Sequence, residues 1–380
     1  MSEVYITRTS HYLPNKPVSN DEMEEYLGQI GERASKSRRI TLRNNGIENR
    51  YYAIDKNGKA THTNAEITSL AVRELMDHNA EKLNEIDLLC CGTSIPDQMM
   101  PSHAVMVHGW LPETKNLEAI TPAGNCCSGM YAFKYAYMAL KLGLAKKAVS
   151  TGSERLSRIL HADHFEIVVQ KMRDLESNSM LAFEKDFLRW MLSDGAGTFL
   201  METEKNPSGP SLKIEWIEAC SFANEVETCM YMANEKLKDG TMKSFMDYTP
   251  TEIVDKSILS IKQDVKLLGS NIVSLGFKKF VEILKEKNFN VDDIAYFLPH
   301  MSSYFFKDKI ADILDECGIS IPEDKWFSNL KTHGNVGAGS IYLMVDELMN
   351  SGQLKTGDKI ILAVPESARF SYVFSLLTVC

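Results

Sequence analysis

Two stretches of the 380-residue chain decide the fold, because they repeat one pattern of turn, helix and strand. Residues 126–154 read CCSGMYAFKYAYMALKLGLAKKAVSTGSE, and residues 337–367 read GAGSIYLMVDELMNSGQLKTGDKIILAVPES. Each begins with small residues, continues through a helix-length apolar run and a glycine turn, and ends in a strand followed by serine and glutamate. Self-similarity at a fixed period indicates a repeated structural unit. We therefore expect two copies of one α/β unit, over residues 1–205 and 206–380.

The helix in each stretch is apolar on nearly every face, from 130 to 144 and from 341 to 349. A helix that is hydrophobic all round lies inside a protein rather than on its surface. Amphipathic helices alternate with short apolar runs, which favours an α/β fold. The sequence thus predicts a central layer of two helices between two sheets. The predicted strands cover residues 86–94, 145–153, 196–201, 294–299, 359–364 and 370–379.

Composition excludes several classes of protein. Hydrophobic residues make up 44% and charged residues 24% of the chain, as in ordinary globular proteins. The 42 basic and 51 acidic residues leave a net charge of −9, which argues against nucleic-acid binding. The sequence predicts no membrane span, no secretion signal and a cytoplasmic location. The eight cysteines form no C-x-x-C pair, so we expect no structural metal site.

Three chemically useful residue types lie at matching places in the two copies. Cys126 and Cys127 stand at the start of the first apolar helix, where backbone N–H groups and the helix dipole favour a thiolate. His300 ends a predicted strand, a common place for functional groups in α/β proteins. Asn335 precedes the second apolar helix. Two buried cysteines that merely fill a tight turn remain an alternative reading of the first motif.

In this order the motifs resemble those of the type III ketoacyl synthases of the thiolase superfamily. That family shows Cys-Ser/Ala-Gly, then Pro-His after a strand, then His/Tyr-Gly-Asn before a helix. The resemblance extends over essentially the whole chain and includes LRNNGIENRYY at 42–52, TGSERL at 151–156 and DGAGTFL at 194–200. It implies a thiolase-like duplicated α/β fold with αβαβα layers, and an acyltransferase that forms carbon–carbon bonds.

The resemblance also implies roles for individual residues. Cys127, directly before Ser-Gly, would be the nucleophile and Cys126 would be packing. His300 and Asn335 would donate hydrogen bonds to the second substrate's thioester carbonyl, and the backbone N–H groups of Cys127 and Ala368 would bind an oxyanion. No cofactor is expected, since the substrates arrive as thioesters of acyl carrier protein or CoA. The enzyme would be a homodimer.

Substrate contacts are expected at four further places. Arg43 best matches the family's cofactor-contacting arginine, and Arg39 stands where the family usually has tryptophan. Met100 stands where the family shapes acyl-chain length, in a loop that reaches toward the partner's pocket. Arg369 lies beside the expected oxyanion site. A basic cluster is either a solvated face or a docking site for phosphopantetheine or an acidic carrier protein; it contains Arg33, Lys36, Arg38, Arg39 and Arg43.

The chain departs from the family pattern in two places. Residues 365–370 replace the usual glycine-rich turn, and residues 156–191 contain an insertion that either lines an enlarged channel or adds bulk at a dimer edge. With Glu154, these departures resemble the branch that makes cyclohexanedione precursors of dialkylresorcinols. Glu154 would then serve ring closure as an acid/base, unless it is a family carboxylate that holds loops.

Three other readings stay open. The protein could be a fatty-acid starter ketosynthase that uses malonyl carrier protein, or an acyltransferase that passes the acyl group to oxygen or nitrogen. A non-catalytic acyl-binding protein is disfavoured, because the cysteine, histidine and asparagine are all present.

Overall fold

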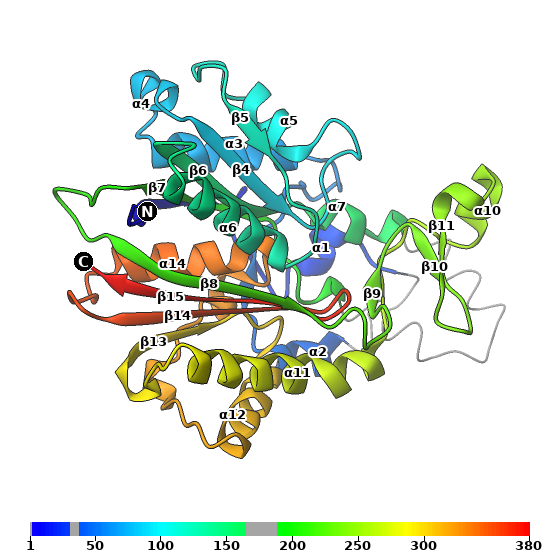
Figure 1. Ribbon diagram of the computed structural model, residues 1–380. Coiled ribbons are helices and arrows are strands. Elements are labelled where there is room, and N and C mark those ends of the chain that lie inside the picture. Colours follow the sequence, from blue (N-terminus) through cyan, green and yellow to red (C-terminus); the bar gives the residue numbers. More distant parts are fainter. Residues whose placement is uncertain (1, 31–37, 165–187) are drawn as a thin grey trace.

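The computed structural model describes residues 2–30, 38–164 and 188–380. Its main feature is a nine-stranded mixed sheet in the order β13-β14-β15-β8-β1-β7-β6-β4-β5 (Figure 1). The strands of this sheet are β1 (Tyr5–Tyr12), β4 (Leu88–Thr93), β5 (Glu118–Ile120), β6 (Lys147–Glu154), β7 (Gly195–Glu202), β8 (Leu212–Ser221), β13 (Ile294–Pro299), β14 (Lys359–Glu366) and β15 (Ser371–Val379).

The sheet contains the same arrangement of strands twice. From β1 outward the order is β7, β6, β4, and from β8 outward it is β15, β14, β13. In both halves the middle strand is antiparallel to one neighbour and parallel to the other. The two half-sheets join through only two residue pairs, Tyr5↔Lys213 and Ile6↔Leu212. The strands therefore form one continuous sheet where the sequence predicted two.

Two helices lie between the half-sheets and form the central layer (Figure 1). They are α6 (Cys127–Lys141) and α14 (Ser340–Asn350). The outer faces are covered by α3 (Asn64–Leu75) and α5 (His103–Gly109) on the first half, and by α11 (Val265–Glu286) and α12 (Lys307–Glu316) on the second. The expected layered α/β fold is confirmed, because the apolar helices bury their side chains against both halves.

Glycines allow the central elements to approach one another closely. A Cβ atom on Gly152 of β6 would lie 2.1 Å from the carbonyl oxygen of Ala338, and one on Gly129 of α6 would lie 2.5 Å from the same oxygen. Tyr342 of α14 donates a hydrogen bond to the Gly129 carbonyl at 2.8 Å. The start of α14 is therefore packed directly on α6 and β6, which brings the two predicted functional motifs together.

The sequence predicted that the apolar run of α6 is buried along its whole length, but the end of the run is exposed. Met138, Leu142 and Leu144 are 43%, 66% and 74% exposed. The run continues past the last helical residue, Lys141, so its end forms surface. None of the described helices is long and apolar enough to cross a membrane.

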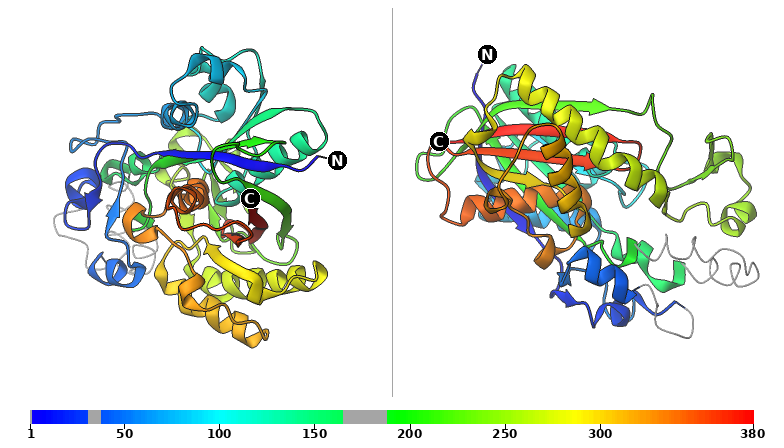
Figure 2. Two further views of the ribbon diagram at one scale, coloured as in Figure 1. Left: turned by 90° about the vertical axis from the view of Figure 1, so that its left-hand side faces the viewer. Right: turned by 90° about the horizontal axis from the view of Figure 1, so that it is seen from below.

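Residues 222–264, between β8 and α11, form a segment that the sequence analysis did not predict. We call it the roof segment, because it covers the cavity described below. It contains β9 (Met230–Tyr231), β10 (Asn234–Lys236), β11 (Met242–Ser244), α10 (Pro250–Asp255) and β12 (Lys262–Gln263). The part with β10, β11 and α10 projects from one end of the molecule (Figures 1 and 2).

Several shorter elements connect the layers. They are α1 (Met23–Leu27), α2 (Arg38–Asn45), α4 (Ala80–Asn84), α7 (Ser157–Leu160), α13 (Leu330–His333), β2 (Val18–Ser19) and β3 (Asn49–Arg50).

Candidate active site

The two cysteines at the start of α6 have different surroundings. Cys126 is partly exposed and lines a large cavity. Cys127 is fully buried, and its thiol donates a hydrogen bond to the carbonyl oxygen of Val364 at 3.3 Å. The carbonyl oxygen of Ser371, at 3.7 Å from the sulfur, is a second possible acceptor. Cys126, which the resemblance marks as a packing residue, thus forms part of the cavity wall. The thiol that the resemblance marks as the nucleophile is the one closed off from the cavity.

A carboxylate from the end of β14 caps the start of α6. Oε2 of Glu366 accepts hydrogen bonds from the backbone N–H groups of Asn125 at 2.7 Å and Cys127 at 3.0 Å. The expected oxyanion donor, the N–H of Cys127, is thus occupied by the protein's own side chain. Ala368, the other expected donor, lines the cavity with its neighbour Ser367.

His300 follows β13 directly and is held by its backbone. Its N–H donates to the carbonyl of Ala363 in β14 at 2.8 Å, which continues the pairing of the two strands. The side chain lines the cavity but is only 4% exposed. Burial lowers the pKa of His300 to about 4, so the imidazole is neutral at pH 7 and can donate a hydrogen bond without carrying charge.

Asn335 lies in the turn between α13 and the 3-10 helix η6 (Gly337–Gly339). Its backbone N–H donates to Met191 at 3.0 Å, and its carbonyl accepts from Ser193 at 2.9 Å. Its side-chain Oδ1 accepts from Gly337 at 2.9 Å, which orients the amide. Within the described chain no hydrogen bond involves the side-chain NH₂ group of Asn335. This donor is therefore available to a molecule in the cavity that Asn335 lines.

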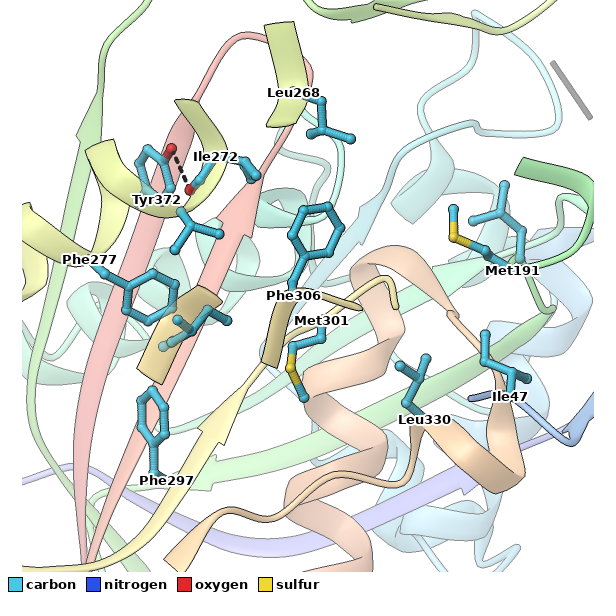
Figure 3. Close-up of a cluster of buried hydrophobic side chains, with 14 of the residues drawn as sticks. Ile47, Met191, Leu268, Ile272, Phe277, Phe297, Met301, Phe306, Leu330 and Tyr372 are labelled. Atoms are coloured by element: carbon cyan, nitrogen blue, oxygen red, sulfur yellow. Dashed lines mark hydrogen bonds between the residues drawn. The ribbon is translucent and has the colours of Figure 1, made fainter. Parts of the chain in front are cut away.

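The cavity has a volume of about 780 Å³ and brings together the second half's His300 and Asn335 and the first half's Cys126. Its walls are mostly apolar, and part of them belongs to the cluster drawn in Figure 3, where α11, β13 and the loop after it pack together. Apolar side chains of the roof segment close another side. Cavity-lining residues shared with the cluster in Figure 3 are Met191, Leu268, Ile272, Phe277, Met301 and Phe306.

Glu154 is buried behind the cavity wall. Its carboxylate accepts hydrogen bonds from the backbone N–H of Ser94 at 3.0 Å, the Ser94 hydroxyl, and the N–H of Ala338 at 3.1 Å. Burial raises the pKa of Glu154 to about 7, and these hydrogen bonds oppose part of that rise. Glu154 does not line the cavity. Ser94 and Gly337, which lie against the Glu154 side chain, do line it.

The structure does not bring the expected substrate-contacting residues to the cavity. Arg39 and Arg43 are exposed on α2, and Arg369 is exposed with its Nε donating to Val226 at 3.2 Å. Met100 is 82% exposed, while its neighbour Met99 lines the cavity. Of the basic cluster, Arg33 and Lys36 lie outside the described residues, as do residues 165–187 of the insertion. Cavity-lining residues at the two ends of that insertion are Leu156, Leu188 and Met191.

Comparison with known proteins identifies the type of enzyme. Residues 284–365 match the family described as 3-oxoacyl-[acyl-carrier-protein] synthase III C terminal. The β-ketoacyl-[acyl-carrier-protein] synthase III of Clostridium perfringens is 26% identical over 356 residues, which cover 92% of each chain. The enzyme of the same name from Neisseria meningitidis is 26% identical over 367 residues, or 95% of each chain. The chain is similar to the β-ketoacyl synthase III enzymes over nearly its whole length, and this similarity marks it as an acyl-transferring enzyme.

Solved structures agree on the fold of this synthase III-like chain. The tetronic acid condensing enzyme AbyA1 superposes with a TM-score of 0.77 and 20% identity over 99% of each chain. OleA of Xanthomonas campestris superposes with a TM-score of 0.71 and 18% identity, again over 99% of each chain. The roof segment is the part of the site that the sequence motifs did not predict. Glu366 stands in the 365–370 stretch that departs from the family pattern, but its contact with the start of α6 was not predicted.

Proposed function

We propose that the protein joins two acyl thioesters by a carbon–carbon bond after holding one acyl group on Cys127. The observation that carries this proposal is the cavity that brings His300 and Asn335 together beside the cysteine pair at the start of α6. Their types fit the chemistry, because a thiol can carry an acyl group and two neutral donors can stabilise an enolate.

The reaction would proceed in two steps. The Cys127 sulfur attacks the first thioester's carbonyl carbon, and the bond from that carbon to the carrier sulfur breaks. The proton lost from the Cys127 thiol passes to the carrier sulfur, and the carrier leaves as a thiol. The α-carbon of the second thioester loses carbon dioxide if the donor is a malonyl-type thioester, or a proton to solvent if it is a 3-oxoacyl thioester. His300 and Asn335 donate hydrogen bonds to the resulting enolate oxygen. The enolate carbon attacks the acyl carbonyl, and the Cys127 sulfur leaves. Both donors can act without changing their own charge.

The finer part of the proposal concerns the substrates. One would be a 3-oxoacyl thioester, and the condensed product would close to a cyclohexanedione precursor of a dialkylresorcinol. The cavity of about 780 Å³ supports long acyl groups, since small-molecule sites span roughly 300–1,000 Å³. Glu154 would assist ring closure through the Ser94 hydroxyl, which accepts or supplies the proton inside the cavity.

The acyl groups would arrive on acyl carrier protein or CoA. Exposed Arg39 and Arg43 on α2 offer positive charge to a phosphopantetheine phosphate or an acidic carrier. The names of the curated relatives favour acyl carrier protein for at least one substrate, and they also favour a second candidate function, a starter synthase that extends an acyl group with malonyl carrier protein.

Intact-mass analysis with candidate acyl thioesters, followed by mass spectrometry of the released product, tests these proposals. An acyl adduct and a cyclic diketone are expected. A linear 3-oxoacyl product would replace the cyclisation proposal with the starter synthase, and an ester or amide would indicate an acyltransferase. Absence of any adduct with every thioester pair would contradict the condensing mechanism.

Glu154→Gln tests the cyclisation step separately. The carboxamide has a similar shape but cannot exchange a proton near pH 7. The variant is expected to form the acyl adduct at the wild-type rate and to release a linear intermediate or its shunt product. Full production of the cyclic product by the folded variant would leave Glu154 a structural residue.

A further inference from the structure

The carboxylate of Glu366 is a buried acidic group that the condensation mechanism does not use. It is 5% exposed and does not line the cavity, although Pro365 and Ser367 on either side of it do. Oε2 accepts the backbone N–H groups of Asn125 and Cys127, and within the described chain no hydrogen bond occupies Oε1. The side chain therefore points behind the cavity wall, toward the start of α6.

This contact reverses the usual effect of a helix start on a thiol. Free N–H groups and the positive end of the helix dipole stabilise a thiolate. Here a carboxylate takes two of those N–H groups and adds negative charge. Burial raises the pKa of Cys127 well above its ordinary value, and the charge of Glu366 is the next largest cause. The thiol keeps its proton and donates it to the carbonyl of Val364.

The other titratable groups around Cys127 do not supply this charge. They lie on α6, directly before it, on β8 and on β15. Burial is the largest cause that raises the pKa of each, so all are neutral at pH 7. They are Cys126, Tyr131, Cys220 and Tyr372. Among the described groups, Glu366 is the carboxylate that acts on the Cys127 thiol.

The turn that follows Glu366, between β14 and β15, is held in place from its outer side. The carbonyl of Ala368 accepts the N–H groups of Cys229 at 2.9 Å and Met230 at 3.2 Å, both in the roof segment. Phe370 at the loop's end has φ of +57°, which side-chain-bearing residues seldom adopt. The two hydrogen bonds to Ala368 hold the backbone next to Glu366, whose side chain contacts the start of α6.

We propose that Glu366 is a positioning residue for Cys127: by capping the two N–H groups at the start of α6, it holds Cys127 as a closed, unreactive thiol in the resting enzyme. Acylation then requires the Glu366 carboxylate to leave these N–H groups, which frees the N–H of Cys127 for an oxyanion. This inference rests on the proposal that Cys127 carries the acyl group.

Thiol alkylation tests the inference without any condensation assay. The folded enzyme would be treated with iodoacetamide between pH 7 and 10, and peptide fragmentation would locate the label on Cys126 or Cys127. In the wild type, Cys127 is expected to react more slowly than the cavity-lining Cys126. Glu366→Gln removes the charge at constant shape and is expected to speed Cys127 labelling at pH 7 at least about tenfold, the change that one pKa unit produces.

Two further variants sharpen the test. Glu366→Ala also frees both N–H groups and is expected to label Cys127 faster than Glu366→Gln does. Glu154→Gln removes another buried carboxylate, one that acts on Cys126, and is expected to leave Cys127 labelling unchanged. The inference would be overturned if, in both Glu366 variants, the rate of Cys127 labelling stayed within twofold of wild type and the pH midpoint of labelling did not change. Product formation by Cys127→Ala would instead overturn the proposed function, which separates the two failures.

Discussion

At the scale of single residues, neighbouring cysteines with the same side chain occupy opposite sides of the cavity wall. Cys126 faces the cavity and Cys127 faces the backbone of β14 and β15. The resemblance favours Cys127 and exposure favours Cys126. The nucleophile can therefore be identified by finding which of the two sulfur atoms carries the acyl group.

Cys127→Ala is expected to abolish both the acyl adduct and the product, because it removes the nucleophile. Cys126→Ala is expected to retain acylation, since only a wall atom of the cavity is lost. Intact-mass and peptide analysis after incubation with an acyl thioester measures both. Label on Cys126 of the wild-type protein would move the nucleophile to that residue.

His300 and Asn335 are expected to serve condensation more than acylation. Each alanine variant should still load an acyl group but form product roughly 100- to 1,000-fold more slowly, the usual cost of one lost donor to a developing oxyanion. Single-turnover loading and product release would be measured separately. Near wild-type condensation by Asn335→Ala would contradict the role given to this amide.

The sequence predicted these positions for a local reason. His300 directly follows a strand and Asn335 precedes a helix, and both features are visible in a short stretch of chain. The Glu366 contact is different, because it joins residues 239 positions apart and depends on a side-chain direction. Likewise, the direction of Cys126 toward the cavity depends on how α6 packs between the two half-sheets, which local patterns do not encode.

At the scale of elements, Glu154 joins three parts of the fold. It ends β6, and it accepts hydrogen bonds from Ser94, just after β4, and from Ala338 in η6. Because its pKa in the folded protein is raised to about 7 from a usual 4.5, its contribution to stability is fully present below pH 4.5. That contribution is lost as the pH rises through 7.

Glu154→Gln lacks this titration and keeps the shape of the side chain. The free energy of unfolding of the wild type, relative to the variant, is therefore expected to fall between pH 4.5 and 7. The fall would be roughly 3 kcal/mol at most, from a shift of about 2.5 pKa units. Urea denaturation across this range measures it, and a difference that does not change with pH would contradict the assigned titration.

Elements with a strong pattern were predicted well, and irregular ones were not. β4, β6, β13 and β14 are apolar runs bounded by turn residues, and each lies where the sequence placed it. The roof segment consists of two- and three-residue strands and a six-residue helix, too short to show a period. The join between β1 and β8 rests on two residue pairs and has no sequence signal.

At the scale of the whole molecule, one edge of the sheet combines open backbone groups with exposed apolar side chains. β5 is the last strand in the order and pairs only with β4. Next to it α5 packs on β4 and β5, and the connection from β4 to α5 carries two strongly exposed methionines. Exposed apolar side chains in this region are Met99, Met100, Val105 and Trp110. An open edge with apolar surface beside it is typical of an interface.

We expect this edge to pair with the same edge of a second copy, since two-fold homodimers are the commonest oligomers. Met100→Lys should weaken the dimer, because an unpaired charge is costly to bury in an apolar contact. Met246→Lys is the matched control, because Met246 is 78% exposed, against 82% for Met100. Met246 lies between β11 and α10, and these two elements project from the molecule away from β5 (Figure 1). Sedimentation velocity would show a dimer for the wild type and for Met246→Lys, and a shift toward monomer for Met100→Lys. A monomeric wild type, or equal sedimentation of both variants, would remove β5 as the dimer edge, and with it the expected reach of Met100 toward a partner's cavity.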